Sequence, residues 1–202
     1  MDHESGKRIA RVSSIKRKTY ETDIELEINI DGTGENSIQT NIGFFDHMLS
    51  TLSKHSSVDM KLKCIGDLEV DYHHSVEDVG IVIGEALLKA LGDKVGIKRF
   101  SNAILPMDDA LVLCAIDISG RSYFSYDVEF DSKMIGKFNT ELVEVFFNSL
   151  AMNLKANLHF KKISGFNSHH IAEACFKSFA ICLKDAVTLT NSGSIPSVKG
   201  CI

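Results

Sequence analysis

The sequence contains the pentapeptide His-His-x-x-Glu twice, once in each half, at residues 73–77 and 169–173. Each copy follows a stretch with strand periodicity and opens a long apolar run with helical periodicity. A Phe-Phe pair on an earlier helical stretch precedes each copy, at residues 44–45 and 146–147. Self-similarity of this kind is typical of an internal duplication. The chain is therefore expected to fold as two related halves.

Periodicity predicts the elements of each half. Apolar and polar side chains alternate along residues 20–30, which predicts a half-buried strand paired with the preceding stretch 8–15. In the first half we further expect a helix at 44–55, a strand at 58–65 and a helix at 76–91 that ends at Gly92. In the second half we expect a hairpin of strands 111–118 and 121–130 around Ser119-Gly120, a helix at 139–155, a strand at 157–163 and a helix from about 169 to 187.

The element order predicts an α+β fold of two pseudo-symmetric halves, each a β-sheet packed on helices and built from ferredoxin-like or split βαβ modules. We place the first half at residues 1–95 and the second at 96–202, with one His-His-x-x-Glu motif in each. The two halves are expected to form one compact unit.

Composition excludes several classes of protein. The 202 residues are 44% hydrophobic and 24% charged, as expected of a globular chain. A net charge of -5 lacks the basic bias of a nucleic-acid binder. Neither an apolar signal segment nor a run of about 18 apolar residues is present, so we expect no membrane association and a cytoplasmic location. The five cysteines are scattered, with no Cys-x-x-Cys pair, and are expected to be reduced and mostly buried.

The spacing within the motif indicates metal binding. Residues four apart share one face of a helix, whereas adjacent residues diverge by about 100°. His73 and Glu77 are thus expected to hold one ion while His74 serves another. The second motif, residues 169–173, predicts the same division of roles. Two sites follow, each with a His/Glu chelate from one motif and a lone histidine from the other. Such ligands suit Mn, Fe, Co or Zn.

Other histidines and nearby acidic residues are interpreted more simply. His3, His55 and His159 lie in no motif, so we leave them out of the ligand set. Asp71 and Asp78 flank the first motif. Either they hold the imidazole rings in place, or they complement the positive end of the helix dipole.

Several short blocks of the sequence form a recognisable set. The blocks are GFFDHML at 43–49, GDL at 66–68, DYHHSVED at 71–78, PMD at 106–108, SGR at 119–121, NSHH at 167–170 and PSVKG at 196–200. They resemble the signature blocks of the imidazoleglycerol-phosphate dehydratase family, and the resemblance extends in order from about Arg8 to the C-terminus.

The resemblance implies a binuclear manganese site between subunits of a homo-oligomer, a 24-subunit shell. One Mn²⁺ would be bound by His47, His74, His169 and Glu173, and the other by His73, Glu77 and His170. The family commonly adds a histidine to the second ion at the position of Val145. Valine cannot bind a metal, so we expect a weaker second site whose fourth place is filled by water, substrate or a group such as Glu144.

The resemblance also implies the reaction, which is the metal-dependent dehydration of imidazoleglycerol phosphate to imidazoleacetol phosphate in histidine biosynthesis. The chain would then be a hydro-lyase with a small phosphorylated imidazole as substrate. The implied catalytic residues are Glu21, as candidate general base, with His47, His74, Glu77, His169 and Glu173. The implied phosphate-binding residues are Arg99, Arg121, Lys177, Ser197 and Lys199, and Glu21 is also expected to contact substrate.

Two other functions fit parts of the pattern. A two-metal phosphohydrolase would also need His/Glu ligands and cations for phosphate, but such sites usually rely on bridging aspartates, and neither motif shows one. A ferritin-type metal shell uses Glu-x-x-His on four long helices. The strand-rich halves expected here disagree with that bundle.

Overall fold

The computed structural model describes residues 10–190 and 192–202. His3 and the first two residues of the strand predicted at 8–15 lie outside the described residues. Within them, no helix is long and apolar enough to cross a membrane.

The first half is a four-stranded sheet with two helices. In chain order its elements are β1 (Val12–Lys18), β2 (Thr22–Asn29), β3 (Asn36–Gln39), α1 (Gly43–Ser56), β4 (Asp59–Gly66) and α2 (His73–Leu91). The strand order is β1-β2-β4-β3, with β3 parallel to β4 and the other pairs antiparallel. The parallel pair requires a crossover, and α1 supplies it.

The second half repeats this arrangement. Its elements are β5 (Phe100–Met107), β6 (Ala110–Asp117), β7 (Tyr123–Asp127), β8 (Met134–Ile135), β9 (Phe138–Asn139), α3 (Glu141–Leu154), β10 (Asn157–Ser164) and α4 (Ser168–Ala186). The strand order is β5-β6-β10-β7, with β7 parallel to β10. The small β8-β9 hairpin is an addition that the first half lacks within its described residues.

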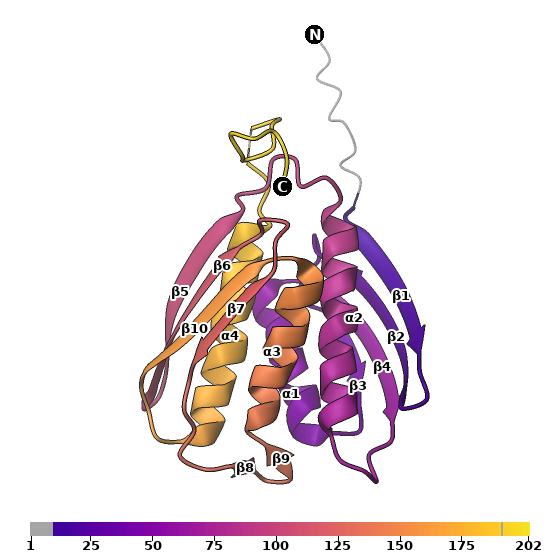
Figure 1. Cartoon of the computed structure of the whole chain (residues 1–202), viewed down its shortest axis with the longest axis vertical. Helices are drawn as coiled ribbons and strands as arrows, with labels where there is room; N and C mark the ends of the chain where they lie inside the picture. The colour runs from indigo at the N-terminus through magenta and orange to yellow at the C-terminus, as the bar shows by residue number, and fades with distance from the viewer. Residues whose placement is uncertain (1–9, 191) are drawn as a thin grey trace.

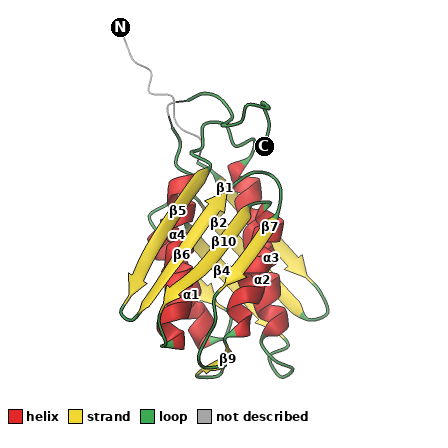
Figure 2. Cartoon of the chain, turned by 60° about the vertical axis from the view of Figure 1, so that its left-hand side comes forward, coloured by secondary structure: helices red, strands yellow, loops and turns green. Residues whose placement is uncertain are grey.

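Both sheets pack on a shared layer of four helices (Figure 1), so the apolar faces of the two halves meet in one core. Figure 2 shows one sheet in front of the helices and the other sheet behind them. This confirms the predicted α+β fold of two related halves, each a sheet on helices. The division between residues 95 and 96 stays a prediction.

One predicted pairing is wrong. The strands at 111–118 and 121–130 were expected to form a hairpin, yet β6 and β7 do not pair, because β10 lies between them. β6 pairs instead with β5, which periodicity missed because Pro106 interrupts its pattern. As an edge strand, β5 tolerates a proline. β3, a short and mostly polar strand, was also missed.

All four helices begin at the same end of the molecule, the lower end in Figure 1. The connections explain this arrangement. β3 and its parallel neighbour β4 lead into α1 and α2, and β7 and its parallel neighbour β10 lead into α3 and α4, α3 by way of the β8–β9 hairpin. The tips of the β1–β2 and β5–β6 hairpins lie at this end too. The motif histidines, at the first turns of α2 and α4, therefore share one end of the fold.

Glycines bring α2 and α3 close together. A Cβ atom at Gly80 would lie 2.7 Å from the carbonyl oxygen of Phe146, and one at Gly84 would lie 2.6 Å from that of Leu150. Both contacts are to backbone, which cannot turn aside as a flexible side chain would. The close approach of α2 to α3 therefore depends on the absence of side chains at these two positions.

We predict that Gly84→Ala destabilises the fold. Overpacking costs about 1–3 kcal/mol, against a helix-propensity gain of about 1 kcal/mol. The urea midpoint of the metal-free protein should therefore fall. Gly43→Ala is the matched control, because nothing lies within 4 Å of a Cβ there. Equal midpoints for the two variants would contradict close backbone packing between α2 and α3.

Candidate metal centre

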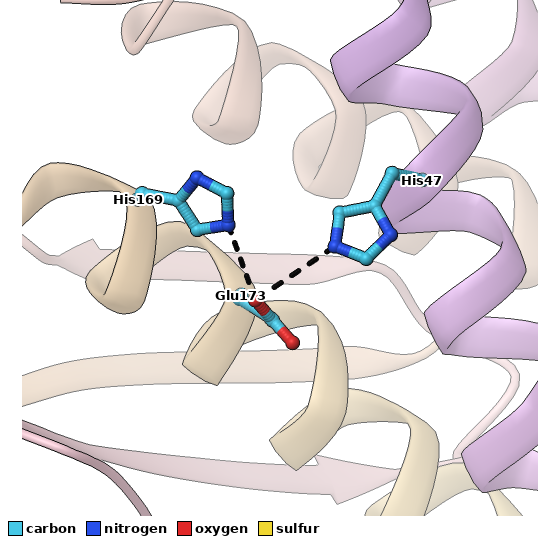
Figure 3. Close-up of side chains that lie close together, drawn as sticks. All are labelled: His47, His169 and Glu173. Carbon is cyan, nitrogen blue, oxygen red and sulfur yellow. Dashed lines mark ion pairs between the residues drawn. The ribbon is translucent and has the colours of Figure 1, made fainter.

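Three potential ligands converge where α1 meets α4. His47 on α1 and His169 and Glu173 on α4 offer ligand atoms that all lie within 4.8 Å of one another. Both rings face the Glu173 carboxylate (Figure 3). The Oε2 atom of Glu173 is 3.3 Å from His169 Nε2 and 3.9 Å from His47 Nε2. Two imidazoles and a carboxylate around one point form a donor set that fits a divalent transition metal.

Local structure explains this convergence. His169 and Glu173 are four residues apart and so share one face of α4. Asn167 caps α4, its side-chain oxygen accepting the backbone N–H groups of His169 and His170. The ring of Phe44 meets that of His169 edge-on, with centroids 5.2 Å apart. The His169 side chain is thus positioned by a cap at its backbone and an aromatic contact at its ring.

The carboxylate of Glu173 is kept ionised by a lysine. Glu173 is 8% exposed, and this burial opposes ionisation. Lys177 Nζ donates to its Oε1 at 2.7 Å. This bond and the charge of Lys177, with smaller contributions from His47 and His169, together offset burial and lower the pKa of Glu173. Lys177 thus supplies positive charge directly at the three-residue cluster.

The first motif lies where α2 meets α3. This contact is the pseudo-symmetric counterpart of the contact between α1 and α4. These helices pack together as α1 packs on α4. His47 and Val145 occupy the same position counted from the starts of α1 and α3. The counterpart of the three-residue cluster is thus His73 and Glu77 with Val145, which is half-buried against the core. His73 lines a cavity of about 230 Å³. Glu144 lies elsewhere, in a pocket with Lys133.

The second histidine of each motif is held by an aspartate. His74 Nδ1 lies 2.9 Å from Asp67 Oδ2, and His170 Nδ1 lies 2.6 Å from Asp109 Oδ1. A second carboxylate faces the other nitrogen of each ring: Glu21 is 3.6 Å from His74 Nε2, and Asp108 is 3.5 Å from His170 Nε2. The hydrogen bond that His74 donates to Asp67, with smaller contributions from other carboxylates, raises the pKa of His74.

The predicted partners Asp71 and Asp78 have other roles. Asp71 accepts the backbone N–H of His73, which fits the helix-terminus interpretation. Asp78 is buried and binds Thr22 and Arg17. Asp67 and Asp109, which do hold the rings, were not singled out from sequence. The sequence signal for them was their position just after a strand: Asp67 lies within the block GDL after β4, and Asp109 directly follows the block PMD after β5.

The remaining histidines lie outside the cluster. His55 is exposed near the end of α1. His159 is exposed on β10, where its ring contacts that of Tyr123.

Comparisons with known proteins identify the family of the chain. Residues 40–183 match the family described as imidazoleglycerol-phosphate dehydratase. The chain belongs to this family. The dehydratase of Prosthecochloris aestuarii is 50% identical over 193 residues, covering 96% of each chain. That of Caldicellulosiruptor saccharolyticus is 51% identical, covering 95% of this chain and 98% of its own. The chain is therefore an enzyme, a dehydratase of the hydro-lyase class.

Solved structures of the family share the fold. The dehydratase structure from Pyrococcus furiosus has a TM-score of 0.82 at 39% identity, over 93% of this chain and 100% of that one. The structure from Staphylococcus aureus has a TM-score of 0.81 at 36% identity, over 89% of this chain and 99% of that one.

The expected phosphate-binding residues of this dehydratase divide between two places. Lys177 lies beside Glu173 at the motif end. Arg99 lies at the opposite end, where its backbone N–H bonds Ala186 at the end of α4. Its guanidinium pairs with Asp117 and donates to the carbonyl of Pro196, which places it beside the segment with Ser197 and Lys199. Arg121 is exposed at this end, its carbonyl accepting from Asn157 at the start of β10.

We predict that Lys177→Met destabilises the metal-free dehydratase by about 1–3 kcal/mol, because it leaves a buried carboxylate without its charged donor. Since folding lowers the pKa of Glu173, this contribution is present above the ordinary glutamate pKa of about 4.3 and is lost as pH falls through the folded value. Urea unfolding at pH 7 and at pH 3.5 should thus show a difference that shrinks at the lower pH.

Lys161→Met is the control for this variant. Lys161 pairs with Asp127, but the two side chains are 63% and 67% exposed. Such surface pairs contribute about 0–1 kcal/mol. A cost for Lys177→Met no larger than for Lys161→Met would contradict a stabilising role for the buried pair.

Proposed function

We propose that this chain catalyses the metal-dependent dehydration of imidazoleglycerol phosphate to imidazoleacetol phosphate, a step of histidine biosynthesis in the cytoplasm. The observation that carries the proposal is the convergence of His47, His169 and Glu173 in a member of this family. Their donor atoms fit a divalent transition-metal ion, and we propose two Mn²⁺ per active site, with other divalent transition metals as alternatives.

The ligand assignment follows the crossed pattern of the two motifs. One ion would be held by His47, His169 and Glu173 with His74, and the other by His73 and Glu77 with His170. When bound, the ions act as Lewis acids and as a template for the substrate. The chain's own residues hold them with neutral imidazoles and ionised carboxylates. Glu173 is prepared for this role by Lys177, which favours its ionised form.

Glu21 is the proposed general base. The proton to be removed lies on a carbon that is not next to a carbonyl, so its removal requires a positioned base while the substrate's imidazole helps to expel the hydroxyl group. The Glu21 carboxylate is half-exposed and 3.6 Å from His74 Nε2. Its backbone is tied at both sides, because its N–H bonds Thr19 Oγ1 and its carbonyl accepts from the N–H of Asp67. The base is thus exposed to substrate yet fixed in place.

The expected site residues lie at two opposite ends of the fold, which indicates a site shared between subunits. α4 has 19 residues and is thus about 28 Å long, with His169 at its start and Arg99 bonded to its end. A single small substrate cannot reach both ends. We therefore infer that Arg99, Arg121, Ser197 and Lys199 bind the phosphate of a substrate held at the motif end of another copy. We expect the homo-oligomer to be a 24-mer.

Exposed apolar side chains support such contacts. At the motif end, the β1–β2 tip and the loops before α2 and α4 carry Tyr20, Val70 and Phe166, with exposed fractions of 109%, 64% and 70%. Large apolar side chains that gather around a functional site commonly mark a surface covered by a partner. A second copy of the chain is the partner that the divided site requires.

The first test is the variant Glu21→Gln. It should retain Mn²⁺ binding while kcat falls by about 10²–10⁴-fold, the usual contribution of a general base. Turnover is followed by the ultraviolet absorbance of the ketone product in alkali. Glu25→Gln on the same hairpin is the control, because Glu25 is exposed and pairs with Lys16. Normal turnover by Glu21→Gln would remove Glu21 from the mechanism.

The second test is metal removal. Treatment with a chelator should abolish turnover and reduce the particle mass measured by light scattering, because ions held by ligands from two copies also join those copies. Adding Mn²⁺ back should restore both properties. A particle mass unaffected by complete metal removal would argue against sites at subunit interfaces.

A further inference from the structure

We propose that Asp67 and Asp109 are positioning residues, which orient His74 and His170 so that each ring presents Nε2 as a metal ligand. This inference rests on the proposed function, because it concerns the same metal site. Metal-binding histidines usually donate their other ring N–H to a carboxylate or carbonyl, and this bond sets both tautomer and orientation. In both motifs Nδ1 is the nitrogen bonded to aspartate, which leaves Nε2 for the ion.

The side chain of Asp67 is hydrogen-bonded to His74. It lies just after β4 and its Oδ2 atom is 2.9 Å from His74 Nδ1. Its Oδ1 atom is buried and has no hydrogen-bond partner among the described residues. Its backbone is fixed by the bond from its N–H to the carbonyl of Glu21. A carboxylate with this geometry gains its hydrogen-bond stabilisation from the imidazole alone.

Asp109 holds His170 and the loop before it together. Its Oδ1 atom is 2.6 Å from His170 Nδ1. Its Oδ2 atom accepts the backbone N–H groups of Phe166 and Asn167 at 2.7 and 2.9 Å. One carboxylate therefore fixes both the path of the chain into α4 and the orientation of the ring.

The two aspartates come from places that are not equivalent in the duplicated fold. Asp67 lies in the connection between β4 and α2, whose counterpart is the connection between β10 and α4. Asp109 lies at the β5–β6 turn, whose counterpart is the β1–β2 turn. Simple inheritance from a duplicated ancestor would place both at one equivalent position. The same contact, made from different elements, indicates a requirement at the imidazole itself.

The surroundings of Nε2 support this assignment. Glu21 and Asp108 place carboxylate oxygens 3.6 and 3.5 Å from the Nε2 atoms of His74 and His170. A lone pair on Nε2 that faces an anionic oxygen is unfavourable unless a proton or a metal ion is bound at that nitrogen. With Nδ1 bonded to aspartate, Nε2 is the ring nitrogen left for a divalent ion, and the negative charge of the nearby carboxylates favours a cation there without making them ligands.

The test is a double-mutant cycle on Mn²⁺ affinity, measured by equilibrium dialysis of the purified full chain. Asp67→Leu removes the acceptor, and we expect affinity to fall about 10–100-fold, as is typical for loss of such a partner. Asp67→Asn keeps an oxygen acceptor and should lose less. If Asp67 acts through the ring, Asp67→Leu with His74→Ala should bind Mn²⁺ no more weakly than His74→Ala alone.

Asp109→Asn provides an independent variant. If its oxygen keeps the two backbone N–H donors, its amide group faces His170 Nδ1 as a donor and forces the proton onto Nε2, where no ion can then bind. Affinity should fall at least as far as in Asp67→Leu although the loop contacts remain. Asp71→Asn is the control for charge, because this nearby carboxylate contacts backbone and not an imidazole.

The outcomes separate the inference from the proposed function. Unchanged affinity in His74→Ala would overturn the ligand assignment itself. A loss in His74→Ala with normal affinity in Asp67→Leu and Asp109→Asn would overturn the positioning role. Additive losses in the cycle, or an equal loss in Asp71→Asn, would overturn it as well. Melting curves in chelator identify any variant that fails to fold, in which case Asp67→Asn and Asp109→Asn decide the matter.

Discussion

The structure depends on burial of two sheets against one shared layer of helices. Each sheet has an apolar face, and the helices between them must be apolar on both sides. Many of the largest fully buried side chains, Phe146, Phe147 and Phe176 among them, come from these helices. Because each parallel pair of strands, β3 with β4 and β7 with β10, leads into two helices from one edge of its sheet, the helices start together. This topology places both motifs at one end of the fold.

Periodicity predicted most of the fold because its elements are long and regular. The alternation of Ile24, Leu26 and Ile28 corresponds to buried positions of β2. The predictions failed where the pairing of a strand depends on a segment that is distant in the sequence. Ser119-Gly120 has the composition of a hairpin turn, yet β10, a later strand, lies between the two strands that flank it. Turn composition describes local conformation and contains no information on which strand fills the neighbouring place.

The candidate site shows the same limit. Helical spacing alone predicted that His169 and Glu173 share a face, and the resemblance to a family added His47 from another helix. Asp67 and Asp109 escaped notice because each meets its imidazole through tertiary structure. Asp71 and Asp78, adjacent to the motif in sequence, were the natural candidates, but the backbone of His73 and the side chain of Arg17 engage them instead.

The contact between α2 and α3 has a mechanical consequence. Gly80 and Gly84 bring the two backbones into direct contact, so neither helix can slide or rotate against the other without a clash. Val145 therefore stands at a fixed place relative to His73 and Glu77. The two helices behave as one rigid piece, and the space beside the first motif is set by backbone rather than by adaptable side chains. A histidine introduced at position 145 would inherit its geometry from that rigidity, at the place that corresponds to His47 in the other half.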